Sequence, residues 1–448
     1  MKLLFISLGC DKNLVDSEVM LGLLTKNGYT LTDDETQADV IVINTCCFIH
    51  DAKEESINTI LEMAQYKEQN LKALVVAGCL AERYKDEILK EIPEIDAVLG
   101  TTSYDSIVEA VNMALAENAG EHFEHYESID YLPDNSEVER VVTTGNHMAY
   151  LKIAEGCDKR CSYCIIPKIR GHFRSVPMEE LLNEAKRLAS EGVKELVLVA
   201  QETTLYGKDL TGEKQLPLLL HELCKIEGIE WIRLLYCYPE EITDELIEAI
   251  KTEEKVCNYI DMPIQHSENR ILQRMGRRTS REDLVAVIKK LRQEIPDITI
   301  RTTLITGFPG ESEEDHEGLM NFVEECKFDR LGVFTYSPEE DTLAATFEDQ
   351  IDEEVKAARR DELMSLQQEI SYEHTQQLVG KTIKVMVEGY LFEDDIYVGR
   401  SYMDAPKVDG CVFINSPEEL MTGDFVYVKI TQGREYDVIG EVDYEFTK

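Results

Sequence analysis

The chain has 448 residues, of which 43% are hydrophobic, so it can build sizeable cores and is not disordered throughout. No run of 18 apolar residues exists and the first apolar run is too short for a signal peptide, so we expect a cytoplasmic protein without a membrane segment. Its 46 basic and 88 acidic residues give a net charge of −42, which repels phosphate backbones and attracts basic partners, so direct nucleic-acid binding is not expected.

Residues 1–120 alternate apolar strands with helical stretches. Strands are predicted at 2–8, 40–44, 73–77 and 98–99, and helices at 15–26, 53–66, 82–90 and 106–115. This alternation predicts an N-terminal domain with a doubly wound parallel sheet. The acidic stretch 121–147 has little periodicity and is expected to be a linker.

The alternation resumes between residues 148 and 376. Strands are predicted at 149–154, 195–200, 231–236, 259–262, 299–305 and 331–334, with helical segments between them. Six strand–helix units predict an incomplete (β/α)6 barrel, because a complete barrel of this kind has eight. A long polar helix at 352–377 is expected to leave the barrel.

Residues 377–448 lose the helical pattern. Short β-rich runs at 382–388, 396–399, 411–414, 425–432 and 437–442 are separated by turn residues, which predicts a small closed barrel of the OB type. This segment carries 14 acidic and 7 basic residues, a balance that suits a protein ligand better than RNA.

Three cysteines lie in one loop directly after the first barrel strand. Cys157, Cys161 and Cys164 are spaced by four and three residues, and the loop belongs at the barrel mouth, where active sites lie. Thiolates bind soft metals and iron–sulfur clusters. Three thiolates would leave one iron of a 4Fe–4S cluster open, which we favour. A zinc site with His172 as the fourth ligand is the alternative.

A second trio of cysteines is spread along the chain. Cys10, Cys46 and Cys79 each follow directly on one of the first three predicted strands. Parallel strands end at one edge of a sheet, so these thiols are expected to meet in a crevice and hold a second cluster, facing the first across a shared cavity. Three buried small side chains are the alternative, and Cys47 could compete with Cys46.

The segments SLGCDKNLVDSE, INTCCFI, VVAGCLAERY, AEGCDKRCSYCIIPKIRG, MPIQHSENRILQRMGR and ITGFPGESEEDH span the whole chain in this order. Together they resemble the methylthiotransferases, a family of radical S-adenosylmethionine (SAM) enzymes that carry the CxxxCxxC spacing. The resemblance implies an N-terminal cluster domain, a radical SAM barrel and a C-terminal TRAM domain, with two 4Fe–4S clusters and SAM as cofactors.

Within the family, SLGCDKN, QETTLYGKDL and YSPEEDTLAA resemble one branch. That branch adds a methylthio group to the β-carbon of an aspartate in the basic small-subunit ribosomal protein S-12. The alternative is the sister branch, of the MiaB type, which carries YGCQMN and modifies isopentenyl-adenosine in tRNA. Two positions depart from the branch pattern: Cys47 and Asp341 each stand where a glycine is usual.

The resemblance also implies a division of roles between the trios. The cluster on Cys157, Cys161 and Cys164 would cleave SAM to a radical that takes a hydrogen from the aspartate β-carbon. The cluster on Cys10, Cys46 and Cys79 would hold the sulfur, which a second SAM methylates. An external reductant and a sulfur donor of unassigned identity complete the reaction.

Four residues are expected to contact SAM from their position, although each could instead pack or cap a strand. They are Tyr163, which precedes the third cysteine of the loop and could contact adenine through its backbone, and Gln201, Thr303 and Gly307, which lie near the ends of later barrel strands. A local basic stretch could meet the SAM carboxylate or the target aspartate, with a solvated face as the alternative; it consists of Lys159, Arg160, Lys168, Arg170 and Arg174.

Overall fold

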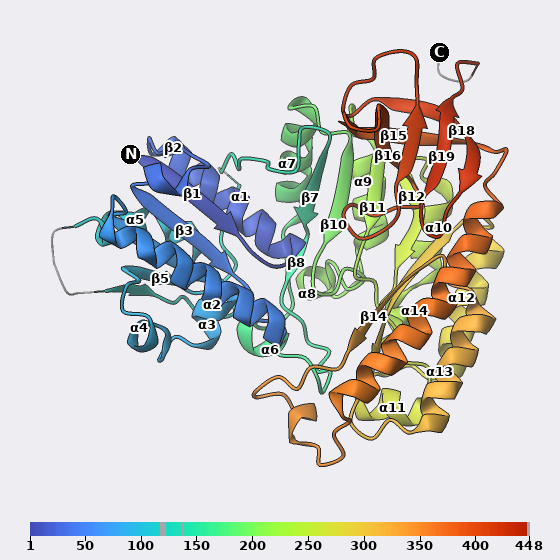
Figure 1. Cartoon of the computed structure of the whole chain (residues 1–448), viewed down its shortest axis with the longest axis horizontal. Helices are drawn as coiled ribbons and strands as arrows, with labels where there is room; N and C mark the ends of the chain where they lie inside the picture. The colour runs from blue at the N-terminus through green and yellow to red at the C-terminus, as the bar shows by residue number, and fades with distance from the viewer. Residues whose placement is uncertain (117–121, 137, 446–448) are drawn as a thin grey trace.

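Figure 1 presents the structure, a computed structural model that describes residues 1–116, 122–136 and 138–445. An N-terminal sheet domain (blue) lies beside a central barrel (green to yellow), and a small β-barrel (red) caps one end of the central barrel. In these described ranges, no helix is both long and apolar enough to cross a membrane.

The N-terminal domain is a six-stranded sheet in the order β2-β1-β3-β4-β5-β6, and every neighbouring pair is parallel. Separate apolar cores lie on its two faces, which confirms the predicted doubly wound sheet. The strands are β1 (Lys2–Ser7), β2 (Thr30–Leu31), β3 (Val40–Thr45), β4 (Ala73–Gly78), β5 (Ala97–Leu99) and β6 (Phe123–His125). Strand β6 lies in the stretch from which the sequence indicated a linker.

The helices of this domain are α1 (Asp11–Lys26), α2 (His50–Ala64), α3 (Cys79–Arg83), α4 (Ile88–Glu91) and α5 (Ile107–Ala114). Helix α1 begins four residues before the predicted start. Its first turns bury polar side chains, such as Asn13 and Asp16, so the spacing of apolar residues did not reveal the start of the helix. The predicted helix at 82–90 is wrong: a turn after Arg83 divides it into α3 and α4.

The central domain confirms the incomplete barrel. Its six parallel strands run in the order β7-β10-β11-β12-β13-β14, an open sheet with β7 and β14 at its edges. The strands are β7 (Met148–Lys152), β10 (Glu195–Val199), β11 (Trp231–Leu234), β12 (Val256–Asp261), β13 (Thr299–Thr306) and β14 (Arg330–Thr335). The outer layer contains α7 (Met178–Ser190), α9 (Leu216–Cys224), α10 (Asp244–Thr252), α12 (Arg281–Glu294) and α13 (Glu313–Cys326).

Short elements decorate the barrel: β8 (Ala154–Glu155), β9 (Arg174–Ser175), α6 (Ile166–Ile169), α8 (Lys208–Thr211) and α11 (Asn269–Arg274). The long helix α14 (Glu353–Gln376) does not leave the barrel, contrary to the prediction. It packs beside β14 and α13 (Figure 1), and Leu363 and Ile370 join the barrel core. A narrow apolar stripe in an otherwise polar sequence was enough for this contact.

The C-terminal domain confirms the predicted five-stranded closed barrel, in the order β15-β16-β17-β19-β18. Its strands are β15 (Thr382–Leu391), β16 (Ile396–Ser401), β17 (Val412–Asn415), β18 (Phe425–Gly433) and β19 (Val438–Val442). Alternating residues fill its interior, among them Val385, Val387 and Val428.

Buried charges fasten this small barrel to the central one. Glu195 of β10, with no exposed side-chain surface, accepts from Arg233 Nε (2.8 Å) and from Arg400 Nη2 of β16 (2.6 Å). Burial raises the pKa of Glu195, but Arg400 and Arg233 outweigh this effect and lower it to about 2. The ion pairs Arg301–Asp409 and Arg330–Asp404 cross the same interface.

We predict that Glu195→Gln lowers the free energy of unfolding by about 3–5 kcal/mol, because two buried guanidinium groups lose their shared counter-charge. The pKa of Glu195 is lower in the folded state than the roughly 4.3 of an unfolded glutamate. Its stabilising contribution is therefore complete at neutral pH and is lost as the pH falls towards about 2.

Urea unfolding at pH 7 and pH 4 measures both effects. Glu230→Gln is the matched control, because Glu230 bonds Lys384 across the same interface (3.0 Å) but lies at the surface, where a pair contributes about 0–1 kcal/mol. Equal losses in the two variants would contradict the assignment.

Candidate functional site

Three of the predicted site cysteines follow the ends of neighbouring strands in the N-terminal sheet. Cys10 caps α1 shortly after β1, Cys46 follows β3, and Cys79 opens α3 directly after β4. The order β1-β3-β4 and the parallel pairing bring these three points to one edge of the sheet.

Glycine permits the close approach of the Cys10 segment to Cys46. Gly9 has φ +91°, and a Cβ atom there would lie 2.6 Å from Cys46 Cβ and 2.9 Å from its Sγ. Burial raises the pKa of both Cys46 and Cys79, and the neighbouring thiolates, including Cys10, raise it further. The three sulfurs therefore lie within electrostatic reach of one another.

Cys47 takes a different direction from Cys46. Its side chain is fully buried in an apolar cluster, and its Sγ donates to the carbonyl oxygen of Cys79 (3.1 Å). Burial raises the pKa of this thiol to about 12. Cys46 instead lies against Gly9, which directly precedes Cys10.

The other trio lies in the loop between β8 and α6, at the mouth of the central barrel. Cys157 donates its amide to Gly171 O (3.1 Å), and the amide of Ser162 donates to Met275 O (2.9 Å). Burial raises the pKa of Cys157 to about 12 and also raises that of Cys164; the Cys161 thiolate adds to both shifts. The three thiols are thus neighbours, and backbone hydrogen bonds to Gly171 and Met275 anchor the loop that carries them.

Two observations bear on what these thiols hold. His172, the alternative zinc ligand, has a side chain that is 68% exposed and bonded through Nδ1 to Asp158 (2.8 Å). In the ranges that the structure describes, no group of three or more His, Cys, Asp or Glu side chains is placed to hold a single metal ion. A cubane cluster takes one thiolate at each iron, so its ligands need not converge on one point, and trios of soft thiolates fit such a cluster.

A buried charge network joins the two trios. Arg170, 2% exposed, donates to Cys79 Sγ (3.5 Å), to Asn13 Oδ1 (2.9 Å) and to Asp16 Oδ2 (2.8 Å) in the N-terminal domain. It also donates to Glu155 Oε2 (3.1 Å), two residues before Cys157.

Lys152 closes this network, because it pairs with both Asp16 and Glu155. Burial would raise the pKa of Glu155, but the charges of Arg170 and Lys152 outweigh it and hold the pKa far below its usual value. Two cations and two carboxylates are thus buried together between the cysteine trios.

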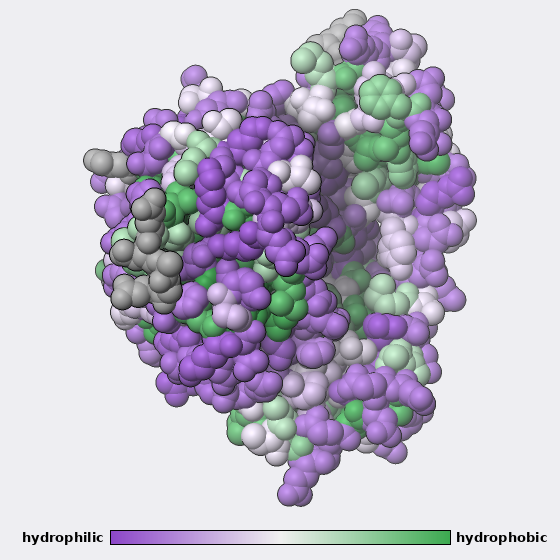
Figure 2. Space-filling model, turned by 60° about the vertical axis from the view of Figure 1, so that its left-hand side comes forward, coloured by the Kyte–Doolittle hydropathy of each residue, from purple (hydrophilic) through white to green (hydrophobic). Residues whose placement is uncertain are grey.

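A cleft runs between the N-terminal domain and the remaining two domains (Figure 2). Its visible walls are mainly hydrophilic.

Asp341, which replaces a usual glycine in the loop after β14, has φ +66°, the left-handed region that glycine adopts easily. That loop meets the N-terminal domain through Glu339, which pairs with Arg83 (3.1 Å).

The four residues expected to contact SAM take different positions. Tyr163 packs edge-on against Phe308, with ring centroids 6.5 Å apart. Gln201 donates to Glu155 Oε1 (2.6 Å), and so belongs beside the charge network. Thr303 is half-buried on β13, and its carbonyl accepts from the Gln265 amide.

Gly307 is committed to local packing. It has φ +67°, its amide donates to Glu311 Oε2 (2.9 Å), and a Cβ atom there would lie 2.2 Å from Lys356 Cγ. In the basic stretch, Lys159 pairs with Glu240 and Glu241, Arg170 pairs as described, and Lys168 is exposed.

Sequence reasoning missed two buried cations near the cysteines. Arg277 is 7% exposed and lies over the ring of Tyr238 (4.4 Å), whose hydroxyl is 3.9 Å from Cys161 Sγ. Lys12 is 5% exposed and lies over the ring of Tyr236 (3.3 Å). A lysine two residues after a candidate ligand, in the run GCDKN, was the available signal for Lys12.

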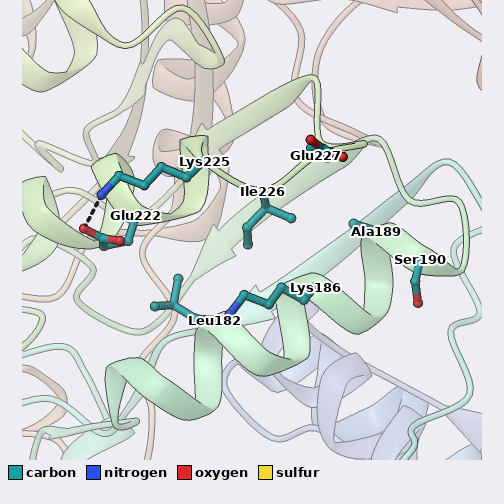
Figure 3. A pocket seen from close by; sticks show the side chains of 8 residues that line it. All are labelled: Leu182, Lys186, Ala189, Ser190, Glu222, Lys225, Ile226 and Glu227. Atoms are coloured by element: carbon teal, nitrogen blue, oxygen red, sulfur yellow. Dashed lines mark hydrogen bonds and ion pairs between the residues drawn. The ribbon is translucent and has the colours of Figure 1, made fainter.

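A hollow on the outer layer is separate from this site. It lies between α7 and the end of α9 (Figure 3), where Leu182 and Ile226 line it beside the pair Glu222–Lys225 (2.7 Å). Its lining includes none of the six cysteines.

We predict that Arg170→Met loosens the N-terminal domain from the barrel and costs about 3–5 kcal/mol, because Asp16 and Glu155 then share only Lys152 as a counter-charge. Urea unfolding measures the loss, and hydrogen exchange at α1 and β7 measures the loosening. Lys168→Met is the control, because this neighbouring cation is 60% exposed. Unchanged exchange at both elements would contradict the prediction.

Three family models match the chain: "Uncharacterized protein family UPF0004" at residues 2–100, the radical SAM superfamily at 151–323 and the TRAM domain at 379–442. Among solved structures, the radical SAM methyltransferase TsrM from Kitasatospora setae is similar in fold, with a TM-score of 0.58 at 13% identity over 85% of this chain and 78% of that chain.

Curated relatives match from end to end. The protein from Lachnoclostridium phytofermentans is 62% identical over 99% of this chain and 100% of its own length. Those from Acetivibrio thermocellus (52%; 99% and 98%) and Clostridioides difficile (50%; 99% and 99%) are similar over comparable spans. All three are named ribosomal protein uS12 methylthiotransferase RimO. With the radical SAM superfamily match in its barrel, this chain belongs to the RimO family of radical SAM methylthiotransferases.

Proposed function

We propose that this chain adds a methylthio group to the β-carbon of an aspartate in ribosomal protein S-12 (uS12). The observation that supports the proposal is that one buried guanidinium, Arg170, bonds both Cys79 Sγ and Glu155, two residues before Cys157, and so connects the two domains that carry the trios. Through this connection, the N-terminal trio would hold the sulfur that a radical from the barrel trio requires.

We assign one 4Fe–4S cluster to Cys157, Cys161 and Cys164, and a second to Cys10, Cys46 and Cys79. With SAM, a cluster on the barrel trio would supply a 5′-deoxyadenosyl radical, which suits an aspartate β-carbon because acid–base chemistry cannot easily remove its hydrogen. Both trios offer three thiolates, so each leaves one iron free for another ligand.

The chain's own residues position these parts. Arg170 fixes Cys79 against Glu155 and thereby sets the spacing between the two trios. We propose SAM contacts at Tyr163, Gln201, Thr303 and Gly307. Arg277, a buried cation beside the Tyr238–Cys161 contact, is placed to bind the SAM carboxylate.

The charge of the chain supports a basic protein substrate. With a net charge of −42 and 14 acidic against 7 basic residues in the C-terminal segment, the enzyme attracts a basic ribosomal protein and repels RNA phosphates.

We predict that uS12 from a strain lacking this gene loses the mass of one methylthio group on its aspartate-containing peptide, while tRNA isopentenyl-adenosine keeps its modification. Mass spectrometry of both molecules from the same cells tests this, and a plasmid copy of the gene should restore the uS12 mass. Loss of the tRNA modification alone would contradict the proposal.

We predict that Cys157→Ala abolishes reductive cleavage of SAM, whereas Cys10→Ala retains cleavage but yields no methylthiolated uS12. Each variant should hold about four irons per chain after anaerobic reconstitution, against about eight in the wild type. Cys411→Ala is the control, because that thiol lies in the C-terminal domain. Methylthiolation by Cys10→Ala would rule out the division of roles.

A further inference from the structure

Lys12 is a buried cation that makes no ion pair with a carboxylate in the part of the chain that the structure describes. Its side chain lies in the first turn of α1 and is 5% exposed, and among the described residues no carboxylate oxygen is within 4.0 Å of its Nζ. The ring of Tyr236, 3.3 Å away, compensates the charge only in part. Burial lowers the pKa of Lys12, but Tyr236, the Cys10 thiol and Asp11 outweigh this effect and raise it, so the ammonium stays charged although no carboxylate pairs with it directly.

The nearest acidic neighbour in sequence, Asp11, lies within electrostatic reach of Lys12 but makes no ion pair with it. Asp11 hydrogen-bonds with the hydroxyl of Tyr150. The other cations around the cysteines, apart from Arg277, have carboxylate partners: Lys152, Lys159 and Arg170. Lys12 can therefore bind an anionic ligand, whereas Lys152, Lys159 and Arg170 are already paired with carboxylates.

Lys12 also has links to members of both trios. It follows Cys10 by two residues and lies within electrostatic reach of that thiol. Tyr236 belongs to the segment after β11, at the barrel mouth, and Tyr238 of the same segment lies 3.9 Å from Cys161 Sγ. Two tyrosines of one short segment therefore contact Lys12 and Cys161, respectively.

The segment that presents Tyr236 is rigidly held. Tyr236 has φ +61°, which is unusual for a residue with a side chain, and its amide donates to Asp261 Oδ2 (2.9 Å). Arg301 in turn binds Asp261 Oδ1 (2.7 Å). The position of the Lys12 ammonium is therefore defined before any ligand arrives.

We propose that Lys12 binds the carboxylate of the target aspartate and is the residue that selects aspartate over its neutral analogues. The inference rests on the proposed function. The aspartate carboxyl is bonded directly to the β-carbon, so an ion pair at Lys12 holds the reacting carbon between the two trios. Arg277, beside Cys161, is left for the carboxylate of SAM.

The test uses the reconstituted holoenzyme and two labelled synthetic peptides, one carrying the target segment of uS12 and one with asparagine in place of the target aspartate. The wild type should bind the aspartate peptide about 10- to 100-fold more tightly than the asparagine peptide in anaerobic fluorescence anisotropy. Lys12→Met, of similar length but uncharged, should bind both peptides equally, with unchanged SAM affinity and unchanged iron content.

Lys26→Met is the matched control, because Lys26 is exposed in the last turn of the same helix. Equal binding of both peptides by the wild type would overturn the inference, whether or not Lys12→Met is stable. Weaker SAM binding by Lys12→Met with an intact aspartate preference would overturn it too and would assign Lys12 to the SAM carboxylate. The proposed function fails separately, if the wild type does not methylthiolate uS12.

Discussion

The buried guanidinium of Arg170 is the interaction on which the arrangement of the site depends. It joins Cys79, Asn13 and Asp16 of the N-terminal domain to Glu155 of the barrel, and it does so out of contact with water. Charges buried in this way stabilise a structure only when every partner is in place, so the network tolerates a single relative position of the two domains. That position brings Cys79 and Glu155, two residues before Cys157, to one guanidinium group, which neither domain could achieve alone.

The chain carries a large excess of acidic residues, and several of its buried charges form ion pairs. The net charge of −42 belongs to a surface suited to a basic partner. Buried basic side chains lie at the interfaces between domains. Examples are Arg170 and the contact of Glu195 with Arg233 and Arg400. Both interfaces bury ions against ions, which fixes orientation more sharply than apolar contact does, because a misplaced ion loses its partner.

Much of the fold could be predicted from periodicity, because parallel strands buried on both faces read as continuous apolar runs, as in β3 and β4. The errors arose where burial did not follow hydrophobicity. Helix α1 buries Asn13 and Asp16 against another domain, so its start was misplaced, and α14 joins the barrel through few apolar residues. The candidate cysteines could be identified because each follows a strand or lies in one short loop, whereas Arg277 and Lys12 carry no spacing that marks them.

The sequence by itself determined the order of the domains, the two sets of cysteines and the acidic balance, because these are properties of local pattern and composition. The tertiary structure alone decided that Cys46 lies against Gly9 while Cys47 enters the core, since adjacent residues point in different directions and only packing assigns them. It also decided which cations remain without a carboxylate. A lysine has the same charge wherever it stands in a sequence, but whether that charge is neutralised depends on residues brought near it by folding, as the contrast between Lys152 and Lys12 demonstrates.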